Sequence, residues 1–174
     1  MNNFKNLFEN IDPYTINESV FKIIDKDWML VTAGKEGHFN MMTASWGTLG
    51  ILWHRPIAVC FIRPQRYTFQ FTEEYNYFTL CFFEEKYRKA LQVCGTHSGK
   101  DTDKVKAADL KPASTELKNI AFEEARLIIE CKKLYFDDLK QENFIIPEIA
   151  LQNYPNKDYH RFYIGEIVKC YMKK

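Results

Sequence analysis

The sequence carries almost no net charge, and this absence argues against two classes of partner. Its 24 basic and 23 acidic residues leave a formal charge of +1, so no basic field attracts nucleic acid or an anionic membrane. The longest clean apolar run, residues 57–62, is far too short to cross a bilayer. The first residues, MNNFKNLFEN, lack the apolar segment of a signal peptide. We therefore expect a cytoplasmic protein that binds neither nucleic acid nor membrane.

Paired cysteines and metal-ligand spacings are also missing. The five cysteines, at positions 60, 81, 94, 131 and 170, are odd in number and include no C-x-x-C pair. This pattern indicates neither a disulfide framework nor a zinc knuckle. His38, His54 and His97 show no metal spacing with each other or with the cysteines. We expect reduced thiols and no metal site.

Nucleotide-binding signatures are absent or incomplete. No G-x-G-x-x-G occurs, so the sequence does not indicate a Rossmann domain. The stretch CGTHSGKD, residues 94–101, approaches a P-loop, but Cys94 replaces the first glycine and Asp101 replaces the hydroxyl residue. A P-loop also follows a buried strand, whereas residues 84–94 have helical spacing. The P-loop interpretation is therefore rejected.

A weaker hypothesis survives for the same stretch. Ser98 and Gly99 precede a helix expected over residues 101–108, with Lys104 close by. Helix N-termini and lysines attract anions, so a single phosphate suits this place. The alternative is an ordinary Ser-Gly helix entry.

What is present indicates one β-rich domain spanning residues 1–174. The length suits a single core, and the aromatic content of 16% is high, which favours strands or a flat aromatic ligand. Alternation and turn residues predict strands over 28–33, 38–46, 57–62, 77–83, 122–139 and 159–173, a turn over 34–37, and helices over 15–25, 68–75, 84–94 and 101–108. The fold class expected is mainly β with inserted helices, arranged as a small barrel.

Two further stretches are candidates for ligand binding. In NMMTASWGTLG, residues 40–50, small side chains occupy a strand, so a flat ligand can lie against the backbone. The alternative there is a β-bulge or a tight packing seam. In RPQRYT, residues 63–68, Arg63 and Arg66 suit an anion and Thr68 suits a helix cap. The alternative is a pair of solvated arginines.

Five stretches taken together resemble the flavin reductase-like family, and most closely its flavoredoxin-type FMN proteins. They are DWMLVTAG (27–34), FNMMTASWGTLG (39–50), FIRPQRYT (61–68), YRKALQVCGTHSGKDTDK (87–104) and YHRFYIGEI (159–167). The resemblance implies an FMN-binding split β-barrel and a homodimer with flavin at the subunit interface.

The resemblance also implies roles for particular residues. The flavin ring edge would be lined by residues from Asn40 to Trp46, namely Asn40, Met42, Thr43, Ala44, Ser45 and Trp46. The phosphate side would be served by Arg63, Arg66, Tyr67 and Thr68, with Ser98, Gly99 and Lys104 closing over it.

One departure from the family pattern concerns the electron donor. Many relatives carry Gly-Asp-His before the last strand, a motif associated with nicotinamide oxidation, whereas here Tyr159 stands between Asp158 and His160. His160 is the catalytic candidate, although a lone histidine is more often structural. The function expected is that of an FMN oxidoreductase taking electrons from NAD(P)H, as a candidate co-substrate, or from a protein donor. The alternative is a non-catalytic FMN-binding or flavin-sensing module.

Overall fold

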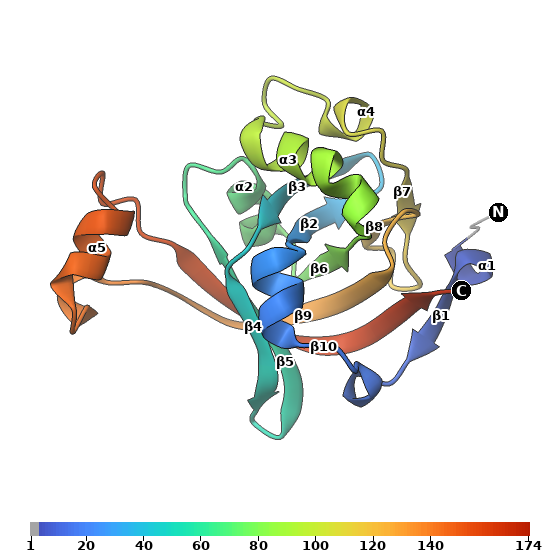
Figure 1. The fold of residues 1–174 in the computed structure, drawn as a ribbon, viewed down its shortest axis with the longest axis horizontal. Coiled ribbons are helices and arrows are strands. Elements are labelled where there is room, and N and C mark those ends of the chain that lie inside the picture. Colours follow the sequence, from blue (N-terminus) through green and yellow to red (C-terminus); the bar gives the residue numbers. More distant parts are fainter. Residues whose placement is uncertain (1–3) are drawn as a thin grey trace.

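The computed structural model describes residues 4–174, whose core is an antiparallel β-sheet curled upon itself (Figure 1). Residues 1–3, which belong to the predicted domain and begin the stretch MNNFKNLFEN, lie outside the described residues. The strands of this sheet are β1 (Phe8–Ile11), β2 (Met29–Lys35), β3 (His38–Ala44), β4 (Gly47–Leu52), β5 (Arg55–Ile62), β6 (Tyr77–Phe82), β9 (Leu127–Asp138) and β10 (Arg161–Lys173). Their order is β3-β2-β6-β9-β10-β5-β4, and β1 also pairs with β10. A separate pair is formed by β7 (Pro112–Ser114) and β8 (Ile120–Phe122).

The sheet is open along one seam. Strands β3 and β4 lie at opposite ends of the strand order, and within residues 4–174 no ladder joins them. The chain nevertheless passes directly from β3 to β4 through Ser45 and Trp46. The single strand expected over residues 38–46 is therefore wrong in its last part, because the chain leaves the edge of β2 after Ala44 and then pairs with β5.

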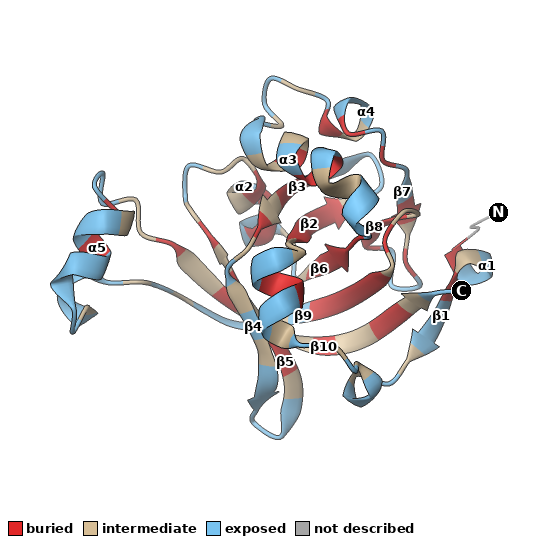
Figure 2. Cartoon of the chain, viewed as in Figure 1, coloured by how far each residue is buried: buried red, intermediate tan, exposed pale blue. Residues whose placement is uncertain are grey.

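Both faces of the sheet are covered where β9 begins. Its first five residues, Leu127 to Cys131, are all buried (Figure 2). Alternate side chains point to opposite faces of a strand, so Leu127 and Ile129 enter the apolar cluster inside the barrel, called here the barrel cluster, while Ile128 enters a second cluster beneath helix α3 (Arg88–Thr96). Burial on both faces explains why four of these five residues are apolar; the remaining one, Glu130, is also buried and accepts hydrogen bonds from the Thr115 hydroxyl at 2.5 Å and the Asn119 amide at 2.6 Å.

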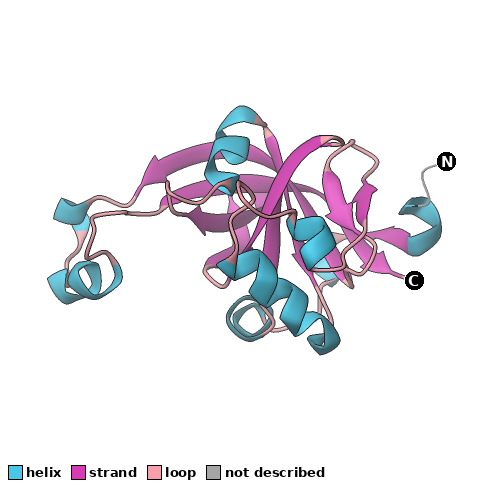
Figure 3. Ribbon diagram, turned by 90° about the horizontal axis from the view of Figure 1, so that it is seen from above, coloured by secondary structure: helices cyan, strands magenta, loops and turns pink. Residues whose placement is uncertain are grey.

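The helices are short and fill the gaps around the sheet (Figure 3). They are α1 (Phe4–Leu7), the 3-10 turns η1 (Pro13–Thr15), η3 (Glu85–Tyr87) and η4 (Gln141–Asn143), the π-helical turn η2 (Lys22–Lys26), α2 (Thr68–Glu74), α3 (Arg88–Thr96), α4 (Lys104–Ala107) and α5 (Pro147–Asn153). The fold class expected, mainly β with inserted helices, is confirmed.

Two of the predicted helices are wrong in extent. The helix expected over 15–25 is reduced to the η2 region, where only Ile23 and Ile24 are buried. The helix expected over 101–108 begins at Lys104, because Asp103 accepts a hydrogen bond from the backbone N–H of Lys106 at 3.2 Å and caps it.

An arm projects from the end of the sheet between β9 and β10. This segment, residues 139–160, carries η4 and α5 and is called here the α5 arm (Figures 1 and 3). It turns Ala150 and Tyr154 inward and leaves Ile145, Ile146 and Leu151 exposed. No helix was predicted in this segment.

All five cysteines are free and buried. Cys60, Cys131 and Cys170 belong to the barrel cluster, whereas Cys81 and Cys94 belong to the cluster beneath α3. Burial raises the pKa of the Cys60, Cys81 and Cys170 thiols to about 12.

Candidate functional site

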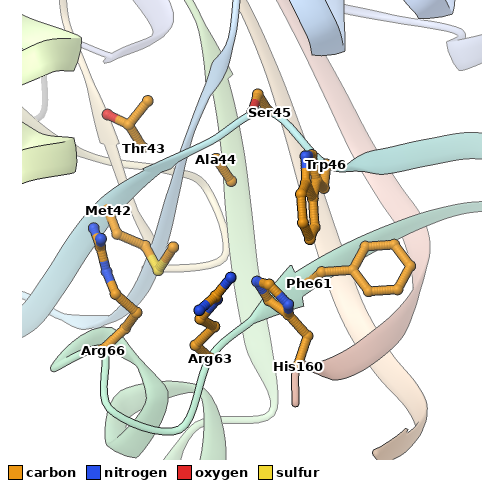
Figure 4. A pocket seen from close by; sticks show the side chains of 9 residues that line it. All are labelled: Met42, Thr43, Ala44, Ser45, Trp46, Phe61, Arg63, Arg66 and His160. Atoms are coloured by element: carbon orange, nitrogen blue, oxygen red, sulfur yellow. The ribbon is translucent and has the colours of Figure 1, made fainter. Parts of the chain in front are cut away.

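A cavity of about 270 Å³ lies at the open seam of the sheet. The end of β3, the β3–β4 connection, the end of β5 and the residue before β10 meet there. Its lining consists of Met42, Thr43, Ala44, Ser45, Trp46, Phe61, Arg63, Arg66 and His160 (Figure 4). We call it the seam pocket. It brings together eight of the residues singled out from the sequence and adds Phe61.

The small residues of the β3–β4 segment serve two purposes. Thr43 donates from its hydroxyl to the Leu91 carbonyl at 2.5 Å, which fixes this wall of the pocket against α3. Gly47 pairs with Cys60 in the antiparallel β4–β5 ladder, and a Cβ there would approach the Val59 carbonyl oxygen to 2.6 Å. The packing seam considered from the sequence therefore applies to Gly47, whereas Thr43 to Trp46 line the pocket.

One end of the pocket is cationic. Arg66 is partly buried, and its Nη2 atom has no hydrogen-bond partner among residues 4–174. Burial lowers the pKa of Arg66, and the nearby charge of Arg63 lowers it further. Because an unpartnered buried guanidinium nitrogen is unfavourable, this end of the pocket is suited to an anion.

Lys104 adds a third positive charge behind β3. Its buried ammonium donates to the carbonyls of Met41 and Cys94. Burial lowers the pKa of Lys104 to about 8, and the charge of Arg66 acts in the same direction. Lys104 does not itself line the seam pocket, but an anion bound beside Arg66 would offset the repulsion between these two cations.

Arg63 lines the pocket, but its guanidinium is hydrogen-bonded to the α5 arm. Its guanidinium donates to Asp158 Oδ2 at 2.5 Å and to the Asn153 carbonyl at 2.9 Å. It also lies 5.2 Å from the centre of the Tyr154 ring. Arg63 is therefore not a solvated surface arginine, and its charge is already paired by Asp158.

A second group of predicted residues adjoins the pocket without lining it. Asn40 donates from Nδ2 to the Thr68 hydroxyl at 2.8 Å, and both side chains are buried. A Cβ on Gly99 would collide with Asn40 and would lie 2.9 Å from the Tyr67 ring. Only glycine therefore lets the loop after α3 approach β3 so closely.

Two local interpretations of these residues are wrong. Thr68 does not cap α2, because the preceding residue Tyr67 is already helical and Thr68 bonds Asn40 instead. Ser98 and Gly99 do not open a helix, because α4 starts only at Lys104. Ser98 is exposed, and its hydroxyl accepts from the backbone N–H of Lys100 at 3.2 Å.

The other end of the pocket is aromatic. The His160 ring centre lies 4.9 Å from that of Trp46 and 6.4 Å from that of Phe61. Its Nδ1 atom hydrogen-bonds the Tyr154 hydroxyl at 2.8 Å. Burial lowers the pKa of His160 to about 4, and Arg63 acts in the same direction. The imidazole is therefore neutral at physiological pH.

Two residues of the site were missed from the sequence. Phe61 lies in a predicted strand, where an aromatic residue needs no functional explanation, and Tyr154 lies in a segment with no predicted element. The adjacency of Phe61 to Arg63 was the one available signal.

The described residues 4–174 also contain no cluster of three or more His, Cys, Asp or Glu side chains able to hold a metal ion. No helix in that range is long and apolar enough to span a bilayer.

The sequence model of the flavin reductase like domain matches residues 24–174. The fold is similar to flavoredoxin from Methanosarcina acetivorans, with a TM-score of 0.66 and 23% identity over 94% of this chain and 77% of that one. It is also similar to an FMN-binding domain of a flavin reductases-like enzyme from Shewanella baltica (TM-score 0.68, 15% identity, 95% and 76% coverage).

A third similar structure is a Streptomyces globisporus NADH:FAD oxidoreductase in complex with NAD and FAD fragments. Its TM-score is 0.63 at 16% identity, over 85% of this chain and 77% of that one. No curated protein matches the sequence. At these identities the structural likeness shows the fold alone, and it confirms the expected split β-barrel.

Proposed function

Since the chain belongs to the flavin reductase-like family, we propose that it is an FMN-binding oxidoreductase that passes electrons from NAD(P)H or a protein donor through FMN. The observation that carries this proposal is the unpartnered, buried Nη2 of Arg66 at the cationic end of the seam pocket. A flat ligand with one phosphate matches a pocket that is cationic at one end and aromatic at the other.

The residues present fit FMN. Arg66 and Lys104 would hold the phosphate, with Tyr67, Thr68, Ser98 and Gly99 closing the adjoining surface and Asn40 fixing Thr68. The ring system would lie along Met42, Thr43, Ala44, Ser45 and Trp46. When bound, FMN supplies the hydride or electron transfer, while the protein supplies orientation and electrostatics.

His160 would position the electron donor rather than transfer a proton. With a pKa of about 4 it is neutral at physiological pH, so it would contact the donor through its ring surface and one ring nitrogen and would supply no charge. Its hydrogen bond to Tyr154 and its contact with Trp46 hold the ring still. A nicotinamide donor arriving at this end of the pocket would pack beside these rings.

The first test is the absorption spectrum of the purified protein, followed by anaerobic addition of NADH and NADPH. We expect a yellow protein that bleaches with one of them. A yellow protein that is inert to both would favour a protein donor or the non-catalytic module. A colourless protein that FMN cannot reconstitute would overturn the proposal.

The second test is the substitution Arg66→Ala. Because Arg66 would contact only the phosphate, FMN affinity should fall while riboflavin affinity stays the same. Charge-assisted hydrogen bonds contribute about 1.5–3 kcal/mol, which corresponds to about one to two decades in affinity. Both ligands are titrated by fluorescence, with Arg55→Ala as the control, since Arg55 pairs with Glu166 on β10 and does not line the pocket. Equal losses for both ligands would assign Arg66 a structural role.

One observation supports the non-catalytic FMN-binding or flavin-sensing module as the second candidate. Asp158, which stands one residue further from the histidine than in many relatives, accepts bonds from Arg63 and Gln65 at 2.5 Å each. Both bonds fall on the Oδ2 atom of this carboxylate, while its Oδ1 atom is buried without a hydrogen-bond partner among residues 4–174, so Asp158 does not present a free, exposed acid to a nicotinamide.

A further inference from the structure

We propose that a groove beside the seam pocket binds the ring of an uncharged, planar aromatic molecule, the substrate class of the proposed oxidoreductase. This inference rests on the proposed function, which it deepens. The groove has a volume of about 360 Å³ and is lined by Trp46, Phe61, Leu139, Phe144, Ile149, Asn153 and Tyr154. It lies between the end of the barrel and the α5 arm, and we call it the arm groove.

The arm groove and the seam pocket share two walls. Trp46 and Phe61 line both cavities, and Figure 4 shows these two side chains on the same side of the seam pocket as His160. A ring held in the groove would therefore lie directly beside the place proposed for the flavin. Such proximity is what transfer between a bound cofactor and a substrate requires.

The wall supplied by the arm is held in place by contacts within the protein. Tyr154 is buried, hydrogen-bonds His160 at 2.8 Å, and has its ring 6.0 Å from that of Phe144. The Tyr159 ring packs 4.8 Å from that of Tyr154. At the opposite side, the backbone N–H of Leu139 donates to the His160 carbonyl at 2.9 Å. The groove is therefore formed before any ligand arrives, which lowers the entropic cost of binding.

The lining determines the chemical class of the ligand. No charged side chain lines the groove, and Asn153 is its one polar residue. The Asn153 amide already donates to the Ile149 carbonyl at 2.9 Å, and its backbone carbonyl accepts from Arg63. Nothing in the lining pairs with a phosphate or a carboxylate, whereas four aromatic rings offer stacking and edge contacts to an uncharged ring.

A second copy of the chain is the rival occupant. The most exposed apolar residues of the arm are Ile145, at 97%, and Leu151, at 73%, and neither lines the groove. A surface that served only to contact another copy would place its exposed apolar residues at the contact. Among the groove residues Trp46 and Ile149 are less exposed, at 44% each, and Tyr154 is buried, which suits a small molecule.

The test compares two variants on the same helix. Ile149 lines the groove and is 44% exposed, so Ile149→Glu places a charge in the groove without disturbing the core. Leu151→Glu places the same charge on α5 outside the groove. Menadione, an uncharged planar naphthoquinone, is titrated calorimetrically into each protein, with and without saturating FMN. Wild type and Leu151→Glu should bind menadione equally, and Ile149→Glu should bind it at least about tenfold more weakly.

The other outcomes separate this inference from the proposed function. The proposal that the arm groove is a ligand site would be overturned by any of three results: no menadione binding to wild type, equal binding by Ile149→Glu, or displacement of menadione by FMN. Conversion of a dimer to a monomer by Ile149→Glu, with no menadione bound to wild type, would assign the groove to a second copy. If menadione binds as expected but FMN does not, the groove stands and the proposed function fails.

Discussion

At the scale of single residues, Lys104 carries the charge that is most easily removed from the site. Burial lowers its pKa to about 8, so the ammonium loses its proton as the pH rises through that value. A phosphate monoester has its second pKa at about 6 and keeps its charge over this range. We therefore expect FMN affinity to fall by about tenfold or more between pH 7 and pH 9.5, while riboflavin affinity stays constant.

Fluorescence titrations of both flavins across this pH range provide the measurement. Lys104→Met is the matched variant: its FMN affinity should be low at pH 7 and independent of pH. A wild-type ratio of FMN to riboflavin affinity that does not change with pH would remove Lys104 from the phosphate site.

His160 should make the stability of the protein depend on pH in acid. Burial lowers its native pKa from 6.5 to about 4, so between these values the unfolded chain binds a proton that the native chain does not. The free energy of unfolding therefore falls as the pH drops from 6.5 toward 4. We expect a loss of about 2 kcal/mol, allowing for partial solvent screening in the pocket.

Urea denaturation of wild type and His160→Gln at pH 7, 6, 5 and 4 isolates this contribution. The carboxylates titrate in both proteins, so the difference between the two curves reports the histidine alone. Parallel curves would mean that His160 titrates normally in the native state.

At the scale of elements, the α5 arm depends on one arginine from the barrel. Arg63 contacts both Asn153, at the end of α5, and Asp158, shortly before β10 begins. We expect Arg63→Met to raise hydrogen exchange over residues 147–158 by roughly 10–100-fold, the equivalent of one charge-assisted bond of about 1.5–3 kcal/mol. The strands of the sheet should exchange as before.

Hydrogen exchange followed by mass spectrometry gives this measurement. Arg55→Met is the control, because it breaks an arginine–carboxylate pair of similar length, 2.6 Å, that does not touch the arm. Unchanged exchange in Arg63→Met would show that the aromatic contacts of Tyr154 hold the arm by themselves.

The strands that could be predicted were those whose local residue pattern matches the environment that the fold gives them. β5 and β6 are bounded by turn residues and are rich in β-branched and aromatic side chains, so their positions followed from pattern alone. β4 was missed because Gly47 and Gly50 weaken the strand signal. The turn after it, Trp53-His54, also lacks the Asn-Gly or Asp-Gly pair that marks a hairpin.

The seam pocket was predictable in part for a similar reason. Arg63, Arg66 and the small residues of β3 attracted attention because their residue types suit a ligand. The ion pair between Arg63 and Asp158 joins residues 95 positions apart in the sequence, and no local pattern predicts such a contact. Tyr154 belongs to the site only because the arm folds back, which local pattern cannot show.

At the scale of the whole molecule, we propose that the chain forms the homodimer that the family resemblance implies, and the exposed tip of the β4–β5 hairpin supports this. Trp53 and His54 both have left-handed φ values, 51° and 58°, a conformation that disfavours bulky side chains. Trp53 is 55% exposed, and Ile51 beside it is also exposed. Large apolar side chains held at such a turn are explained if they are covered by a second copy.

Multi-angle light scattering should therefore give twice the 20.7 kDa mass of the chain. The double variant Trp53→Asn and His54→Gly suits the turn better, yet it should increase the fraction of monomer. A wild-type monomer at micromolar concentration that still binds FMN tightly would argue against a flavin site at a subunit interface.

The buried cysteines have a consequence for how the protein responds to oxidants. A thiol reacts as its thiolate, and pKa values of about 12 for Cys60, Cys81 and Cys170 leave almost none of it at pH 7. Alkylating reagents and peroxide should therefore modify these side chains only when the chain unfolds. The rate at which these cysteines are labelled therefore measures the rate of unfolding, and redox chemistry of the folded protein would have to take place on the proposed FMN rather than on these thiols.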